Sequence, residues 1–384
     1  MQVLINIDPL RPPLTGIGRY TWELVQGLRQ HPDIDEVVTF ADGVPTAPEH
    51  MMGSTADKPV TARARPMIKR WAQRIPGSHA LYARWCNLRF RRWVDGYRHA
   101  VYHEPNYLLR PFPGAGVTAV HDLSYLHYPD FHPPQRMRLM QAQLPRTLQR
   151  ADHILTLSDF IRQELIDLFG ISPQRITTTP LAAAGSFQPY KRQQTHSVLS
   201  QYNLHHDGYL LSVATLEPRK NLLALTDSYC ALPAELRRQY PLVLVGGLGW
   251  QLELFQARLE QQLRRGEVRH LGYIPENQLP LIYAGARGFA CTSVYEGFGL
   301  PVLEAMACGV PVLSSDRSSL PEVVGDAGLL IDPDQHDQLV TGLQQLLTDK
   351  TYRQRSRERG LARARQFSWT QFINKVVSVY RQIV

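Results

Sequence analysis

Short apolar runs rich in β-branched residues alternate along the chain with longer stretches whose apolar residues recur at helical spacing. In the first half, these runs cover 3–7, 36–41, 100–103, 117–121, 153–157 and 175–179. A second series covers 209–213, 242–245, 268–271, 288–291, 311–314 and 328–331. Strands that alternate with helices are typical of a parallel sheet with helices on both faces. The pattern therefore predicts an α/β fold with two doubly wound domains.

A stretch with little periodicity separates the two series of predicted strands. Between Pro180 and His206 the chain is rich in glycine, proline and polar residues, a composition that is typical of a linker. With 384 residues, the chain suits two domains of under about 200 residues each. A final helix is predicted for 369–383, where apolar residues recur at helical spacing.

Composition and charge narrow the class of protein. With 43% hydrophobic and 20% charged residues, the chain has an ordinary globular composition. Its net charge of +8 favours an anionic partner, which leaves a nucleotide, an anionic lipid surface and nucleic acid as alternatives. The four cysteines are scattered and form neither a disulfide framework nor a C-x-x-C pair, which favours a reducing compartment. We expect no signal peptide, because the apolar run at 1–7 is too short for one and no basic region precedes it, and no transmembrane helix, because no apolar run approaches 18 residues.

The segment 288–311 carries the clearest chemical pattern. A predicted buried strand is followed by a loop that contains Gly297 and Gly299, and a proline and a glycine then bracket a short helix. Glycines let a loop backbone approach a ligand closely, and the unpaired N–H groups at a helix start attract an anion. The segment therefore predicts an anion-binding loop.

Two carboxylates, Glu296 in the loop and Glu304 on the helix, flank this predicted anion site. Because carboxylates repel phosphate, they are better suited to accept hydrogen bonds from hydroxyl groups on either side of it. A ligand with a diphosphate between two polyols fits this arrangement. We therefore expect the segment to bind a nucleotide sugar.

Glu296 and Glu304 stand with seven residues between them in E-G-F-G-L-P-x-L-E-A-M-A-C-G-x-P-V. This segment resembles the signature of glycosyltransferase family 4, whose members are retaining enzymes of the GT-B fold. The resemblance implies two Rossmann-like doubly wound parallel-sheet domains that face each other across a cleft, with the final helix crossing back onto the first. We therefore expect an N-terminal acceptor-side domain of residues 1–182 plus 367–384 and a C-terminal donor-binding domain of residues 183–366.

The same resemblance implies roles for the residues of the donor site. It implies that Glu296 binds the transferred hexose and that Glu304 binds the ribose. Arg219 and Lys220 follow a predicted strand at a helix start, where they would hold the leaving diphosphate, although two solvent-exposed cations would give the same pattern. Further donor contacts are expected from Gly297, Phe298, Gly299, Leu300 and the backbone of Ile274, the last of which would meet the nucleobase.

The opposite wall of the cleft is predicted from the first half of the chain. Gly16 and Gly18 follow the first strand, at the edge where open α/β sheets bind ligands. By resemblance this glycine-rich loop faces the donor diphosphate and the acceptor, whereas G-x-G alone also fits a tight turn. His121 ends another strand and is expected to approach the donor hexose, as a histidine of the family does. His103 is better explained as a buried, hydrogen-bonded residue, and Arg19 receives no role.

A basic stretch with aromatic residues covers 63–98, where ten Lys or Arg residues accompany one acidic residue, Asp95. Such a stretch can lie on an anionic bilayer with its aromatic rings at the level of the headgroups. The same composition fits a nucleic-acid groove or a solvated helix face with core aromatics. Family 4 enzymes that act on lipid-linked acceptors often dock by a basic N-terminal surface, so we favour the membrane. No nucleic-acid recognition motif accompanies the charge, so we expect no nucleic-acid partner.

Two D-x-D triplets raise the question of a metal ion. Residues 33–35 and 332–334 have the form by which another glycosyltransferase fold holds a divalent ion. Both triplets lie beside expected turns, where aspartate is common. Because Arg219 and Lys220 are available to offset the diphosphate charge, we expect metal-independent turnover and no cofactor.

The donor and acceptor are predicted from resemblance only. The run 121–133 resembles mannosyltransferases of polysaccharide assembly, which favours GDP-mannose as donor and a glycan or lipid-linked oligosaccharide as acceptor, in O-antigen or lipopolysaccharide biosynthesis. A UDP-hexose donor and a sugar-nucleotide epimerase on the same fold stay open as alternatives. We expect a cytoplasmic protein, with peripheral attachment to the inner face of the cell membrane as an option.

Overall fold

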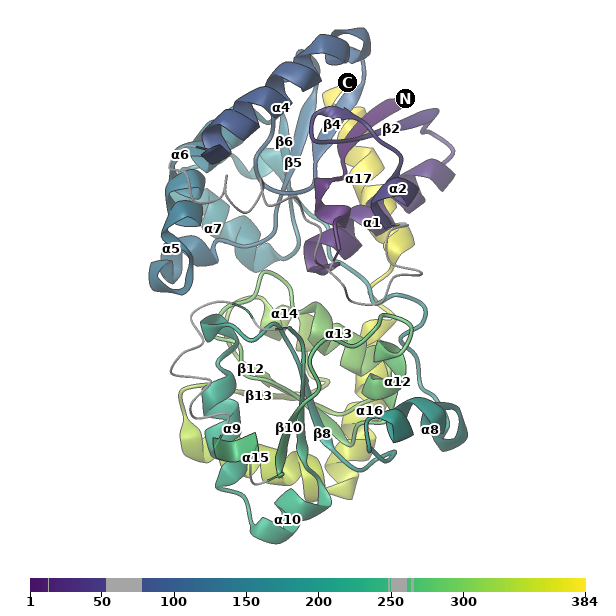
Figure 1. Ribbon diagram of the computed structural model, residues 1–384, viewed down its shortest axis with the longest axis vertical. Helices are drawn as coiled ribbons and strands as arrows, with labels where there is room; N and C mark the ends of the chain where they lie inside the picture. The colour runs from purple at the N-terminus through teal and green to yellow at the C-terminus, as the bar shows by residue number, and fades with distance from the viewer. Residues whose placement is uncertain (13, 53–77, 248, 250–260, 264–265) are drawn as a thin grey trace.

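The computed structural model describes residues 1–384 except 13, 53–77, 248, 250–260 and 264–265. Two halves, each built on one β-sheet, lie one above the other along the long axis of the molecule (Figure 1). We call them the N-terminal half, which contains the first sheet, and the C-terminal half, which contains the second. The prediction of two parallel-sheet α/β units is confirmed.

The sheet of the N-terminal half has seven strands among the described residues, in the order β3-β2-β1-β4-β5-β6-β7. Their bounds are β1 Gln2–Asn6, β2 Glu36–Ala41, β3 Val44–Pro45, β4 Val101–Glu104, β5 Gly116–Val120, β6 His153–Thr156 and β7 Ile176–Thr178. All pairs are parallel except β2 with β3. The prediction missed only β3, because a strand of two residues has no periodicity to detect.

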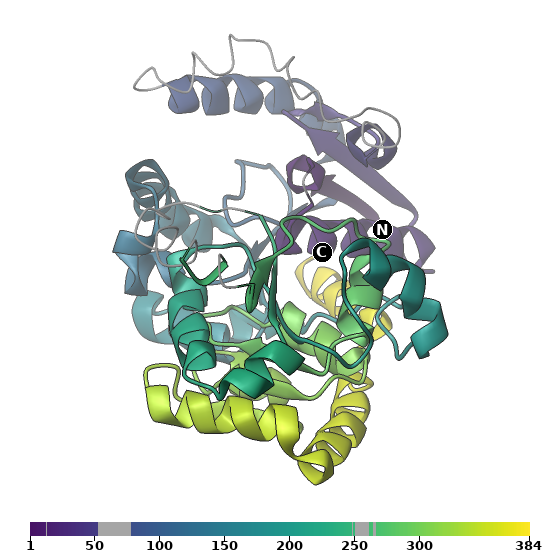
Figure 2. The ribbon, with the colours of Figure 1, turned by 60° about the horizontal axis from the view of Figure 1, so that its bottom comes forward.

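Helices cover both faces of this sheet, with bounds α1 Gly16–Gln30, α2 Pro48–Met52, α4 Ser78–Val94, α5 Ser124–His127, α6 Pro134–Arg150, α7 Asp159–Phe169 and α17 Trp369–Ile383. Successive residues of a strand point to opposite faces. Val3 and Ile5 therefore join the cluster that contains apolar residues of α1 and α17. Leu4 joins the other cluster, with apolar residues of α4, α6 and α7. Figure 2 shows α4 at the outer side of this half.

The sheet of the C-terminal half has six strands among the described residues, all parallel, in the order β10-β9-β8-β11-β12-β13. Their bounds are β8 Leu210–Val213, β9 Leu242–Val245, β10 Val268–His270, β11 Gly288–Cys291, β12 Val312–Ser315 and β13 Leu329–Ile331. The helices are α8 Arg192–Gln201, α9 Leu222–Cys230, α10 Ala234–Gln239, α12 Leu279–Ala284, α13 Leu300–Ala307, α14 Leu320–Val324, α15 His336–Thr348 and α16 Lys350–Ala364. Each strand of both predicted series is present, with bounds within one residue of those expected.

The predicted linker is wrong in its second part. Residues 181–190 contain no regular element, but α8 lies inside the expected 180–206 stretch. Only Thr195, Val198 and Leu199 of α8 are buried, so its apolar face was too narrow to be detected. The helix is held by packing against α12.

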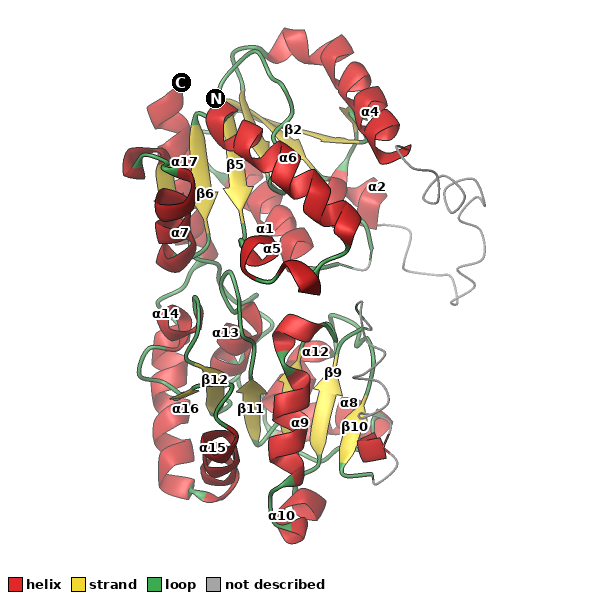
Figure 3. Cartoon of the chain, turned by 90° about the vertical axis from the view of Figure 1, so that its left-hand side faces the viewer, coloured by secondary structure: helices red, strands yellow, loops and turns green. Residues whose placement is uncertain are grey.

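The last helix, α17, returns to the N-terminal half. It packs against α1 and β6, and Phe372, Val376 and Tyr380 are almost fully buried there. The exact division into 1–182 plus 367–384 and 183–366 stays a proposal. In Figure 3 the strand arrows of both sheets point toward the junction of the two halves. The carboxyl ends of the strands, where open α/β sheets bind ligands, therefore face each other.

Candidate active site

The loop after β11 forms a compact ionic cluster with the loop after β8. Lys220 Nζ lies 2.5 Å from Glu296 Oε1, and Arg219 Nη1 lies 3.0 Å from Glu296 Oε2. Ser293 Oγ donates to the same carboxylate at 2.7 Å, and Arg219 Nε also pairs with Glu217 at 2.7 Å. The structure thus brings together three of the predicted site residues: Glu296, Arg219 and Lys220.

The charge state of Glu296 follows from this cluster. Burial raises its pKa, but Lys220 and Arg219 outweigh burial and lower the pKa to about 2. The backbone of the loop is held as well, since the Glu296 N–H donates to Ser318 Oγ and its carbonyl accepts from Ser319 Oγ, both at 2.8 Å. Glu296 is therefore a fixed, ionised hydrogen-bond acceptor.

The pKa of Glu304 is shifted in the opposite direction from that of Glu296. It is 5% exposed, and burial outweighs the nearby Arg19 and raises its pKa to about 7. Arg19 reaches it from the N-terminal half, with Nη1 at 2.5 Å from Glu304 Oε1 and Nη2 at 3.2 Å from Glu276 Oε1. Sequence inspection left Arg19 without a role, because its partner lies 285 residues away.

Glycine occupies its positions in the two loops for different structural reasons. Gly299 precedes α13 with φ +107°, a conformation that favours glycine. A Cβ added to Gly297 would lie 1.8 Å from the His121 carbonyl oxygen, so the two halves touch at this point. A Cβ at Gly18 would lie 2.6 Å from Leu14 Cδ1, whereas one at Gly16 would meet no described atom within 4 Å.

His121 lies at the end of β5, facing the C-terminal half. Its Nε2 lies 2.6 Å from the Pro105 carbonyl oxygen, which can only accept, so Nε2 carries the proton. Burial lowers its pKa, which keeps the ring neutral. His103, by contrast, is enclosed by the hydroxyl groups of Tyr20 and Tyr380 at 3.1 and 2.5 Å, which fits the structural interpretation.

The remaining predicted donor residues offer little side chain to a ligand. Phe298 is 5% exposed and packs edge-on against Phe367, with ring centroids 5.7 Å apart. Ile274 is 3% exposed and belongs to the large hydrophobic cluster. Leu300 is the first residue of α13. Any contact of Phe298 or Ile274 with a donor would therefore involve the backbone, as was expected for Ile274.

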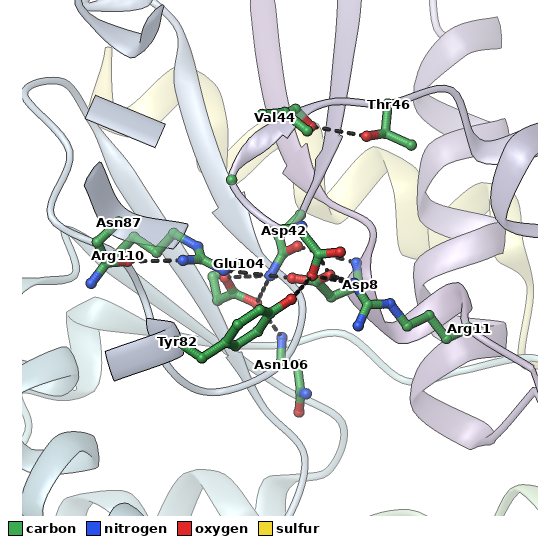
Figure 4. Close-up of polar contacts among 12 residues, drawn as sticks. Asp8, Arg11, Asp42, Val44, Thr46, Tyr82, Asn87, Glu104, Asn106 and Arg110 are labelled. Carbon is green, nitrogen blue, oxygen red and sulfur yellow. Dashed lines mark hydrogen bonds and ion pairs between the residues drawn. The ribbon is translucent and has the colours of Figure 1, made fainter. Parts of the chain in front are cut away.

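Sequence inspection missed a polar network at the carboxyl ends of β1, β2 and β4 (Figure 4). Arg110 Nη1 donates to Asn87 of α4 at 2.8 Å, and Tyr82 of α4 donates to Asp42. Glu104 accepts from Asn6 and Tyr102, and burial raises its pKa to about 7. No motif marks these residues, because they come from separate segments that only the sheet brings together. The network ties α4 to the sheet beside the junction of the halves.

Among the residues that the structure describes, no group of three or more His, Cys, Asp and Glu side chains could hold a metal ion. Asp33 pairs with Arg381, and Asp332 and Asp334 pair with Arg317 at 2.6 and 2.7 Å. Within the described ranges, no helix is both long and apolar enough to cross a membrane.

Two family models match the chain. The model "Glycosyltransferase Family 4" matches residues 14–182, and the model "Glycosyl transferases group 1" matches residues 200–363. O-antigen chain mannosyltransferase B of Escherichia coli is 40% identical over 387 residues, which cover 99% of this chain and 100% of the relative.

Solved structures share the fold over the full length. Sucrose-phosphate synthase of Thermosynechococcus elongatus aligns with a TM-score of 0.75 at 22% identity, covering 100% of this chain and 98% of the other. Anabaena HepE in complex with UDP and glucose aligns with a TM-score of 0.71 at 16% identity, covering 100% of both chains. Together with the two matching family models and the full-length relative, these findings show that the chain belongs to glycosyltransferase family 4 and has the GT-B fold.

Proposed function

We propose that the chain transfers a mannosyl group from GDP-mannose to a growing glycan, with retention at the anomeric carbon, in O-antigen synthesis. The observation that carries this proposal is the 40% identity to O-antigen chain mannosyltransferase B over 99% of this chain and 100% of the relative. The ionic cluster of Glu296, Arg219 and Lys220 at the junction of the halves supports it chemically.

Arg219 and Lys220 hold the leaving diphosphate in this proposal. Within the described residues, Arg219 uses Nε and Nη1 for Glu217 and Glu296, and Nη2 has no hydrogen-bond partner. Lys220 gives one of its three N–H groups to Glu296. The free donors can meet phosphate oxygens without breaking the cluster. Such fixed donors stabilise the negative charge that develops on the leaving group.

Glu296 binds the hydroxyl groups of the transferred sugar rather than attacking it. A carboxylate with a pKa near 2, held by two cations and a serine, is a weak nucleophile. This argues against a double displacement, although two carboxylates flank the site. A front-face reaction, in which the leaving phosphate takes the proton of the acceptor hydroxyl, is consistent with retention. The neutral His121, whose Nδ1 lone pair is its remaining acceptor, contributes to the sugar pocket from the opposite half.

Glu304 and the backbone near Ile274 bind the ribose and the nucleobase. A buried carboxyl with a pKa near 7 can accept a hydrogen bond from a ribose hydroxyl group at little electrostatic cost beside a diphosphate. Gly16, Gly18, Gly297 and Gly299 supply the two loops that approach the donor. The acceptor is a mannose-containing glycan or a lipid-linked oligosaccharide that enters from the N-terminal half. The site needs neither a metal nor a cofactor.

A donor panel tests the proposal. The purified chain is incubated with GDP-mannose, UDP-glucose or UDP-galactose and a mannose-terminated acceptor, and both nucleotide release and the glycan product are measured. We expect GDP release and an extended glycan with GDP-mannose only. Extension with a UDP-hexose would assign the alternative donor, and conversion of the nucleotide sugar without any acceptor would assign an epimerase.

We further propose that the enzyme works in the cytoplasm and docks on an anionic membrane surface through 63–98. Residues 63–77 of this stretch lie outside the described residues. The described part, α4, exposes Trp85 by 49% and Leu88 by 58%, and the Arg89 guanidinium carbon lies 4.2 Å from the Trp85 ring centroid. Co-sedimentation with phosphatidylglycerol vesicles should fall for Trp85→Ala with Arg89→Ala. Unchanged sedimentation, or a salt-dependent gel shift with RNA instead, would contradict this docking mode.

A further inference from the structure

Tyr295, a residue of the C-terminal half, is buried in the core of the N-terminal half. It precedes Glu296 in the loop after β11, is 3% exposed and belongs to the hydrophobic cluster of β4, β5 and α7. Its ring packs against those of His127, Tyr128 and Phe160, at centroid distances of 5.4, 6.0 and 5.8 Å. The loop thus inserts one aromatic side chain across the junction.

We call the site that receives Tyr295, formed by Leu123, His127, Tyr128, Phe160 and Glu164, the socket. Its inner end is polar and matches the tyrosine hydroxyl. The hydroxyl donates to one oxygen of Glu164 and accepts from the Leu123 N–H at 3.2 Å. The other oxygen of Glu164 lies 2.5 Å from His127 Nε2. A buried hydroxyl bound to a carboxylate is a charge-assisted hydrogen bond, stronger than a neutral one. The socket therefore recognises tyrosine rather than any apolar residue.

The socket is continuous with the walls of the proposed active site. Leu123 lies two residues after His121, and Tyr295 is followed by Glu296 and Gly297. Ser158 Oγ, from the start of α7, donates to the Gly297 carbonyl at 2.9 Å. Docking of Tyr295 therefore sets the position of Glu296 relative to His121.

We propose that Tyr295 is a positioning residue that latches the two halves in the arrangement competent for transfer. This inference rests on the proposed function for its kinetic part only. The proposed ligands of the nucleotide, Arg219, Lys220 and Glu304, all belong to the C-terminal half, so nucleotide binding does not need the latch. Transfer needs it, because the sugar must lie between Glu296 and His121.

The test compares Tyr295→Phe, Tyr295→Ala, Glu164→Gln and the double variant Tyr295→Phe with Glu164→Gln. Loss of a hydrogen bond to a charged group lowers the equilibrium constant for closure by about 10-fold to 100-fold. We expect kcat to fall by about 10-fold in Tyr295→Phe and further in Tyr295→Ala, while the Kd for GDP stays within about twofold. In the double variant the loss should be smaller than the sum of the two single losses, because the two substitutions remove one shared contact.

Tyr352→Phe is the matched control. It removes a tyrosine hydroxyl that donates to the Val312 carbonyl at 3.1 Å inside the C-terminal half, so kcat should stay near wild type. An unchanged kcat in both Tyr295 variants, a parallel fall of kcat and GDP affinity, or additive losses in the double variant would each overturn the latch.

A physical measurement separates this inference from the proposed function. Small-angle scattering should show a larger radius of gyration for Tyr295→Ala than for wild type, whichever sugar is transferred. If wild type transfers no sugar from GDP-mannose, the proposed function is wrong. Scattering alone then tests whether Tyr295 latches the two halves. An unchanged radius of gyration in that case would overturn it.

Discussion

Replacing Glu296 by glutamine removes the charge that balances two buried cations. The substitution keeps the shape of the side chain but leaves Lys220 without its paired carboxylate and Arg219 with Glu217 and the nearby charge of Asp122. The fall of the Glu296 pKa from 4.5 to about 2 corresponds to about 3 kcal/mol, at about 1.4 kcal/mol per pKa unit. Breaking a buried ion pair from one side costs about 3–5 kcal/mol, so the two arguments agree. We expect the free energy of unfolding to fall by about 3 kcal/mol at pH 7.

The pH dependence has a defined sign. Because the pKa of Glu296 is lower in the folded chain, the unfolded chain binds more protons between pH 4.5 and 2. The stabilisation by Glu296 is therefore complete above pH 4.5 and is lost as the pH falls through this window. The difference between wild type and Glu296→Gln should shrink to about 2 kcal/mol at pH 3.5.

Urea unfolding at pH 7 and pH 3.5, followed by far-UV circular dichroism, measures both values. Glu49→Gln is the control, because Glu49 is 61% exposed and pairs with Arg29 on the surface, where an ion pair contributes about 0–1 kcal/mol. A loss below about 1 kcal/mol for Glu296→Gln at pH 7, or a difference that grows as the pH falls, would refute the electrostatic argument.

Three further predictions concern the donor site. Glu304→Ala should weaken GDP binding by about 10-fold or more in calorimetry through loss of the hydrogen bond to ribose, and an unchanged Kd would remove its proposed role. Gly297→Ala should lower kcat strongly with little change in melting temperature, because its Cβ would lie 1.8 Å from the His121 carbonyl oxygen only when the halves meet. Gly96→Ala, at a position outside the proposed donor site where an added Cβ would meet no described atom within 4 Å, is its tolerated counterpart. Turnover should persist in EDTA, and a loss restored by Mg²⁺ or Mn²⁺ would show metal dependence.

The strands were predictable because each is a short apolar run with its own local pattern. Residues 242–245 and 288–291, for example, were predicted with the bounds that the structure has. Elements stabilised mainly by distant contacts were not predictable in this way. The antiparallel strand at 44–45 depends on pairing with 40–41, and α8 depends on packing against α12.

In the candidate site, too, the parts with a local sequence pattern were predictable and the parts that depend on distant contacts were not. The spacing of Glu296 and Glu304 lies within one loop and one helix, so a sequence signature can carry it. The Arg19–Glu304 pair and the Gly297–His121 contact join segments that lie far apart in the chain. Gly297 in particular was attributed to close approach of a ligand, whereas in the structure the space beside it holds the backbone of the other half. Only the apposition of the two halves reveals this.

The signature segment is therefore joined to the N-terminal half at both of its ends. Tyr295 enters the socket at Leu123 and Glu164, and nine residues later Glu304 meets Arg19. Glu304 belongs to α13, in which Val302, Leu303 and Met306 are fully buried. Any motion that separates the halves must break both contacts, which moves Glu304 away from Arg19 and Tyr295 away from Leu123 and Glu164. Residues 295–304 therefore include both the tyrosine proposed to latch the halves and the glutamate proposed to bind the nucleotide. Variants at 295 should impair transfer, whereas variants at 304 should impair nucleotide binding.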